Sequence, residues 1–183
     1  MFVFEAPLAK LLETRVHVVM IRLPPLSGRR IRIEVSRQLS DGLREVHAGS
    51  FVRERRIAFD RDLLYKRREF ARIFVHELFH FVWVRLGNPD RRSYERMVLN
   101  EIEQRARGEL GWSAEWRKQA LSRRHWKMRH RRWREYVCES FCDSAAWMFA
   151  GLARHPEFTL AGRYRERRRR WFQRWAGSSQ ISI

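Results

Sequence analysis

Hydrophobic and polar positions alternate along much of the first 60 residues and then recur at helical spacing. The clearest strand pattern is residues 31–36, where Ile31 and Ile33 alternate with Arg32 and Glu34. The predicted strands are residues 15–23, 31–36, 51–53 and 56–59, with a turn at the PPLSG stretch of residues 24–28. Strands followed by helices predict an α+β fold, with a small, mostly antiparallel sheet that has one solvated face.

Five helices are predicted after residue 60, each ended by a glycine, a proline or a change in periodicity. They span about residues 67–86, 88–107, 114–124, 131–152 and 161–175. We expect one domain over residues 1–183, mainly strands in 1–60 and mainly helices in 61–176, followed by a frayed tail at 177–183.

The length of 183 residues suits a single domain with a sizeable core, and 44% of the residues are hydrophobic. The first ten residues lack the basic, apolar and small-residue regions of a secretory signal. No apolar run is long enough to span a bilayer, since the longest, residues 73–84, contains three polar residues. We therefore expect a soluble cytoplasmic protein without a membrane span.

Residues 73–84 carry the strongest chemical signal, because nine of these twelve residues are large and apolar and the exceptions are His76, Glu77 and His80. A helix that is apolar all round is a buried helix, and polar groups inside it are costly unless a partner satisfies them. Positions i and i+4 share one face, so the two imidazoles can bind one metal ion. This is the H-E-x-x-H zinc motif, in which the glutamate activates a metal-bound water.

The structural alternative is a pair of core histidines satisfied by hydrogen bonds, with Glu77 in a buried ion pair. Two histidines at this spacing, with a glutamate between them and no other polar residue nearby, favour the metal over this alternative.

A catalytic zinc site usually has a third protein ligand, for which Glu139 is the best candidate. Glu139 and Asp143 are also at i and i+4, on a helix rich in apolar residues. Like charges at this spacing repel, whereas a dication and a histidine N–H on the same face would stabilise both. Glu139 would bind zinc and Asp143 would accept the outer N–H of a ligand histidine. The alternative is an amphipathic helix with two solvated acids.

Other ligand sets stay open at this stage. His125 or His130 could supply a third histidine, as in the DNA-associated SprT-like metalloproteases. Cys138 and Cys142 could join the histidines in a closed structural site, which would leave Glu77 without a role. The two cysteines lie four residues apart, where a disulfide is geometrically awkward, so we expect free thiols that act as small core residues.

The two motifs together resemble known families. H-E-L-F-H at 76–80, followed on another helix by E-x-x-x-D at 139–143, is similar to the gluzincin pattern of thermolysin-like metallopeptidases. The stretch E-S-F-C-D-S-A-A-W-M-F-A also resembles the glutamate helix of small intracellular ImmA/IrrE-type metallopeptidases. The resemblance implies a zincin-like fold in which the sheet packs on a buried active-site helix. It also implies zinc (Zn2+) held by His76, His80 and Glu139, with Glu77 as catalytic base, and a peptide or protein substrate.

The formal net charge of +18 indicates a second kind of partner. Such a charge favours anions such as nucleic acid, although arginine-rich composition can also reflect biased base composition in the genome. The excess is concentrated in residues 117–134 and 163–174. Tryptophans are interleaved with these charges at positions 126, 133 and 171, and Trp175 follows directly. Arginine with aromatics suits phosphate contacts and base stacking. Solvated helix faces with tryptophans anchored in the core explain the same pattern.

We interpret the chain as a zinc metallopeptidase, because an intact Glu77 favours this function over two rivals. One rival is a zincin scaffold that binds zinc as a regulator, and the other is a nucleic-acid-binding protein with a structural zinc. An edge strand near residues 56–59 could bind an extended substrate by strand addition. Tyr136, His155 and Tyr164 are candidates for stabilising the oxyanion.

Overall fold

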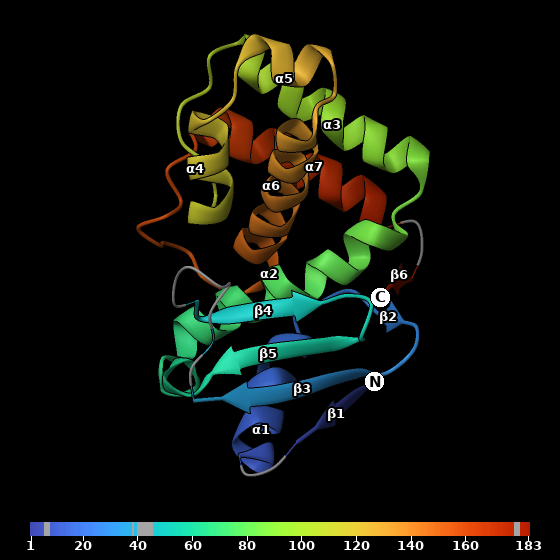
Figure 1. Cartoon of the computed structure of the whole chain (residues 1–183), viewed down its shortest axis with the longest axis vertical. Coiled ribbons are helices and arrows are strands. Elements are labelled where there is room, and N and C mark those ends of the chain that lie inside the picture. Colours follow the sequence, from blue (N-terminus) through green and yellow to red (C-terminus); the bar gives the residue numbers. More distant parts are fainter. Residues whose placement is uncertain (6–7, 38, 40–45, 178–179) are drawn as a thin grey trace.

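Helix α2 (Arg67–Arg85) lies between a four-stranded sheet and a group of helices (Figure 1). The computed structural model describes residues 1–5, 8–37, 39, 46–177 and 180–183. The strands are β1 (Phe2–Phe4), β2 (Leu26–Ser27), β3 (Ile31–Ser36), β4 (Ala48–Phe51), β5 (Arg56–Asp60) and β6 (Ile181–Ser182). The other helices are α1 (Ala9–Met20), η1 (Arg61–Tyr65), α3 (Asn88–Glu103), α4 (Trp112–Gln119), α5 (Arg123–Lys127), α6 (Arg131–Phe149) and α7 (Gly162–Ala176).

The α+β class predicted from the sequence is confirmed, but the sheet is mixed and the expectation of a mostly antiparallel sheet is wrong. The strand order is β1-β3-β5-β4, in which β1 and β5 both run parallel to β3 and only β4 is antiparallel to its neighbour. Adjacent parallel strands need a crossover connection. Helix α1 supplies that crossover between β1 and β3.

The predicted strand at residues 15–23 is therefore wrong, because most of this segment belongs to α1. Leu12, Val16 and Val19 are buried at helical spacing, whereas Val18 is 51% exposed. The β-branched residues suggested a strand, but their helix penalty is only a few tenths of a kcal/mol each. Burial of one helical stripe outweighs so small a preference.

The other predicted strands agree with the structure to different extents. Residues 31–36 form β3 with Ile31 and Ile33 fully buried, as predicted. The predicted strand at 51–53 is displaced, since β4 ends at Phe51 and a turn follows, with Arg55 at φ 56°. The strand expected at 56–59 forms as β5 but lies inside the sheet, so the edge next to it is β4.

The C-terminal end is ordered by strand pairing where the structure describes it. β6 pairs in parallel with β2, which lies within the stretch predicted as a turn. Ile181 and Ile183 are buried against the core. The expectation of a frayed tail is thus wrong for residues 180–183, while residues 178–179 lie outside the described part.

The five predicted helices correspond to α2, α3, α4, α6 and α7, most of them shorter than predicted. The segment expected as one helix at 114–124 is divided into α4, which begins at Trp112, and the separate short helix α5. Among the described residues, no helix combines the length and hydrophobicity that crossing a bilayer requires.

Helix α2 is apolar on both sides because both sides are covered. Phe70 and Phe74 pack against Phe59 of the sheet, with ring centroids 5.1 and 6.2 Å from it. Phe79 packs against Phe141 of α6 at 5.9 Å. His76 is consequently held in the interior, on the side of α2 that faces Glu139 and Asp143 of α6.

Candidate metal centre

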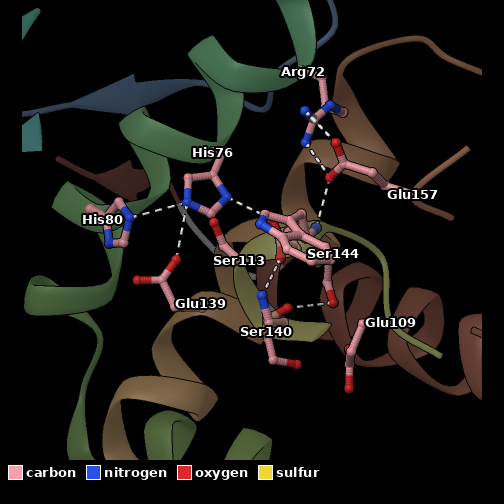
Figure 2. A network of polar contacts seen from close by, with 12 residues as sticks. Arg72, His76, His80, Glu109, Ser113, Glu139, Ser140, Ser144 and Glu157 are labelled. Carbon is pink, nitrogen blue, oxygen red and sulfur yellow. Dashed lines mark hydrogen bonds and ion pairs between the residues drawn. The ribbon is translucent and has the colours of Figure 1, made fainter. Parts of the chain in front are cut away.

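His76 and His80 lie one turn apart on α2 and face Glu139 of α6 (Figure 2). The Nε2 atom of His76 is 3.2 Å from the Nε2 atom of His80 and 3.2 Å from Oε2 of Glu139. One ligand atom from each of the three residues lies within 4.8 Å of the other two. The structure thus brings together the three residues that the sequence proposed as ligands.

The spacing of these donors fits zinc. Ligand atoms placed tetrahedrally about 2.0–2.1 Å from a common ion are separated by about 3.3–3.4 Å. The two 3.2 Å distances are close to such edges. Two imidazole nitrogens this close repel unless a proton or a cation lies between them. The two nitrogens and one carboxylate oxygen are the donor types found in catalytic zinc sites.

Asp143 orients His76 from the opposite side of the ring. The Nδ1 atom of His76 donates to Oδ1 of Asp143 at 2.7 Å, which leaves the Nε2 lone pair free to bind a metal. The second carboxylate oxygen accepts the backbone N–H of Ala114 at 2.9 Å. Ala114 is in the first turn of α4, where free N–H groups and the helix dipole favour an anion.

Gly111 was missed in the sequence, although it governs how closely α4 approaches Asp143. A Cβ atom at Gly111 would lie 2.2 Å from Cγ of Asp143, far inside contact distance. Its φ of −178° is extended backbone that any residue adopts, so the requirement for glycine is purely steric. A glycine just before a predicted helix was the one available signal.

Glu139 is held by cationic groups on more than one side. Burial would raise the pKa of this carboxyl, but the hydrogen bond with His76 and the charges of His80, His76 and Arg117 lower it to about 2. The guanidinium of Arg117 on α4 lies 3.4 Å from Oε1, while Oε2 faces His76. Glu139 is therefore ionised and directed at the histidines.

The pKa values of the two histidines reflect the negative charge that surrounds them. Burial would lower the pKa of His76, but Asp143 and Glu139 raise it well above its ordinary value. The pKa of His80 is also raised, with burial opposed by Cys138 and Glu139. A site that attracts protons in this way also attracts a cation, which competes with protons for the same nitrogen atoms.

Glu77 is 9% exposed and makes no hydrogen bond or ion pair within the part of the chain that the structure describes. The alternative in which Glu77 sits in a buried ion pair therefore finds no partner among those residues. A carboxylate with so little exposure is costly without a partner, and a water molecule is a suitable one.

The cysteines are free thiols that form a second donor set. Sγ of Cys138 is 3.6 Å from Nδ1 of His80, and Cys142 completes a group of three with these two residues. The hydrogen bond with Cys142 and the contact with His80 lower the pKa of Cys138 to about 6. His76 does not belong to this group, so the closed site with both histidines and both cysteines is not assembled.

The alternative third histidines are placed elsewhere. The rings of His125 and His130 lie 5.2 Å from each other. Nδ1 of His125 accepts the Ser122 N–H, and Nδ1 of His130 accepts the Arg132 N–H at the start of α6. Both histidines serve as helix caps and neither joins the donor group of His76 and His80.

The candidates for oxyanion stabilisation are also engaged in other contacts. The Tyr136 hydroxyl donates to buried Glu109 at 2.6 Å, and the Tyr164 hydroxyl accepts from Arg163 at 2.9 Å. His155 is bonded to Glu69. Among the arginines and lysines that the structure describes, Arg117 is the one that contacts a proposed ligand directly.

The segment 163–174 contains a residue that sequence reasoning placed on the surface by mistake. Arg168 is fully buried and pairs with Glu101 at 2.7 Å and Glu109 at 2.8 Å. Lys118 lies 3.1 Å from Glu109. We call this group, completed by Tyr136, the arginine cluster. Its charges are balanced internally, so Arg168 is not available to an anionic partner.

Comparison of the chain with protein-family models, curated proteins and solved structures yields no match.

Proposed function

We propose that this chain is a zinc-dependent metallopeptidase, with His76, His80 and Glu139 as metal ligands and Glu77 as general base. The observation that carries the proposal is the group of three donors, with 3.2 Å from Nε2 of His76 to each of the other two. With it goes Glu77, the neighbour of His76 on α2, which is 9% exposed and has no partner among the described residues. A zinc-binding regulatory scaffold would need the three donors but not Glu77. The proposal therefore rests on both features together, and the zincin-like fold is part of it.

Zinc, when bound, lowers the pKa of a coordinated water to about 7 and polarises the carbonyl that is attacked. The protein residues supply the remaining chemistry. Asp143 keeps the proton of His76 on Nδ1, and Arg117 holds one oxygen of Glu139. The carboxylate of Glu77 accepts the proton of the attacking water and delivers it to the departing amine.

Strand β4 is the best candidate for binding the substrate main chain. It is the outer strand of the sheet on the side nearest α2, and its other edge is paired with β5. An extended peptide can add to such an edge through main-chain hydrogen bonds. Because β5 is an inner strand, β4 replaces residues 56–59 in this role.

The decisive experiment substitutes Glu77→Gln and measures zinc content and cleavage of a mixed peptide library. The variant keeps the size and removes the basicity, so we expect it to fold, retain zinc and lose about 10²–10⁴-fold in activity. Glu13→Gln, at an exposed position on α1, is the matched control and should be as active as the wild type.

Equal cleavage by wild type and Glu77→Gln would reject the mechanism. Zinc bound to both proteins with cleavage by neither would favour the regulatory scaffold. Purified protein that takes up no zinc after reconstitution would reject both.

A further inference from the structure

A basic groove lies between α3, α5 and the start of α6, at the end of the molecule away from the sheet (Figure 1). Its volume is about 1040 Å³. Its cationic residues are Arg92, Arg96, Arg105, Arg123, Lys127 and Arg129, and its acidic residues are Glu95 and Glu103. The arginines of α3 lie outside both segments that the sequence singled out, so only the tertiary structure collects these charges.

Most of the cations in this groove are unpaired. Arg129 bonds Glu95 at 2.5 Å, but the other five cations have no acid within ion-pair distance in the described part of the chain. Like charges gathered around one depression repel one another, and a polyanion would remove that repulsion while releasing its own counterions. The positive charge of the groove therefore favours a ligand with several phosphates or carboxylates.

Two arginines of the groove occupy backbone positions that favour glycine or asparagine. Arg105 (φ 56°) follows α3, and Arg129 (φ 47°) follows α5. Left-handed residues at helix ends are usually Gly or Asn, because a Cβ atom is strained there. Strained backbone of this kind is concentrated at binding sites. The presence of arginine at both positions therefore fits a role of the two guanidinium groups in binding a ligand.

The floor of the groove is apolar and aromatic. Trp126 is half-buried, with Leu99 and Ile102 beside it. Trp133 lies deeper and is fixed by a 2.6 Å hydrogen bond from its Nε1 to Glu95. Aromatic and cationic side chains that line one groove combine a stacking surface with contacts for a charged backbone.

We propose that this groove binds single-stranded nucleic acid. Unpaired bases present their π-faces to an aromatic floor such as Trp126, whereas the bases of a duplex are already stacked on each other. The surrounding guanidinium groups contact the phosphates, which makes affinity strongly dependent on salt. This binding function is separate from the metal centre and does not depend on it.

The exposed face of α7 supplies a control surface of similar charge. Arg163, Arg167 and Arg174 line a smaller hollow there, but it contains no aromatic residue. Its one acid, Glu166, pairs with Arg169 and Arg170. Substituting three arginines on either surface changes the net charge by the same amount.

The first test measures fluorescence anisotropy of a labelled 20-nucleotide mixed-sequence DNA strand at several salt concentrations. The triple variant Arg92→Ala, Arg96→Ala, Arg123→Ala should bind at least about 10-fold more weakly. Its slope of log affinity against log salt should fall by about 2, since each lost phosphate contact removes about 0.7. The variant Arg163→Ala, Arg167→Ala, Arg174→Ala should bind nearly as the wild type does. An equal loss of affinity in both triple variants would show that net charge alone is responsible for binding. It would overturn the proposal that the groove is the binding site.

The second test addresses the aromatic floor. Trp126→Ala should weaken binding of the strand on the order of 10-fold, with Trp126→Phe intermediate, because stacking is lost. Trp112→Ala, at an exposed position of α4, is the matched control and should have no effect. Thermal unfolding of each variant checks that the fold is intact.

Competition identifies the class of ligand. Duplex DNA of the same length and a 20-residue poly-glutamate peptide should both displace the labelled strand poorly. Displacement by the duplex at equal concentration, or unchanged binding by Trp126→Ala, would overturn the single-strand assignment. Displacement by poly-glutamate at equal concentration would overturn nucleic acid as the ligand.

Discussion

Two buried polar clusters lie side by side along α6 and differ in how their charge is balanced. Tyr136, Ser140 and Ser144 form one stripe of the helix; Tyr136 belongs to the arginine cluster and Ser144 accepts a hydrogen bond from Arg168. Glu139 and Asp143 form the neighbouring stripe, which faces His76 and His80. We call these last four residues the metal cluster. Both stripes follow i, i+4 spacing, so the same local rule produces two different environments.

The arginine cluster is closed. Arg168 and Lys118 carry two positive charges that match the two negative charges of Glu101 and Glu109. Burial would raise the pKa of Glu109, but Arg168 and Lys118 lower it, so it stays ionised. Tyr136 donates to Glu109. No additional ion is needed to balance this group.

The metal cluster is open. With neutral imidazoles, Glu139 and Asp143 carry one negative charge more than the contacting Arg117 balances. Glu77, the neighbour of His76 on α2, adds a second negative charge without a partner among the described residues. Two protons on the histidines or one dication would restore the balance. A buried excess of two negative charges is costly, so it indicates a binding site, whereas the balanced cluster beside it indicates structure.

The largest effect should come from breaking the closed cluster. Arg168→Met leaves Glu101 and Glu109 buried without their main partner, which should cost about 3–5 kcal/mol of the free energy of unfolding. Thermal unfolding should show a midpoint lowered by roughly 10 °C or more. The loss should be the same with or without zinc, because the arginine cluster takes no metal.

Arg174→Ala, at an exposed position of the same helix, is the control and should leave the midpoint unchanged. A stable Arg168→Met protein would show that the two glutamates become protonated at little cost, and the cluster would not be the structural one.

The next effect concerns the metal cluster and is measured as a change of stability on adding zinc. Zinc at about 1000 times its dissociation constant should stabilise the wild type by about 4 kcal/mol through mass action. His76→Ala should lose this response, since it removes one of the three proposed ligands, while His17→Ala, on the exposed face of α1, should retain it. Unfolding with and without a chelator measures the difference. A zinc response that survives in His76→Ala would place the ion elsewhere, with His80, Cys138 and Cys142 as the next candidates.

The smallest effect should come from changing the residues that position His76, namely Asp143 and Gly111. Asp143→Asn weakens the hydrogen bond to His76 and should reduce zinc affinity about 10–100-fold, as is typical of residues that orient a ligand. Gly111→Ala should act in the same direction with a smaller loss, because its Cβ atom would displace the Asp143 carboxylate.

Gly162→Ala is the matched control, since a Cβ atom there meets no atom within 4 Å. Competition with a zinc-sensitive dye gives the three affinities. Wild-type affinity in Gly111→Ala would mean that the first turn of α4 does not position Asp143.

Local regularities of the sequence were enough to identify much of the candidate site. His76 and His80 lie together because a helix repeats every 3.6 residues, and the apolar residues around them indicated that the helix is buried. The same helical period predicted that Glu139 and Asp143 share one face of their helix. The helical second half of the chain and strand β3 were predicted for the same reason, since their periods are local properties.

Contacts between distant segments were decided only by the tertiary structure. Helix α1 replaced a predicted strand because β1 and β3 are parallel and need a crossover, a requirement that no local pattern displays. In the sequence, Arg168 cannot be distinguished from its exposed neighbours. In the folded chain it is buried because it pairs with Glu101 and Glu109.

The same distinction applies to the environment of each site. Glu139 lies beside the histidines while His125 and His130 cap helices elsewhere, and Ala114 of α4 anchors Asp143. Periodicity determines which side chains share a face of one helix, but burial energy summed over the whole core determines which faces meet. The sequence by itself therefore determined the donor residues, and the fold decided which of them came together and which charges were left unbalanced.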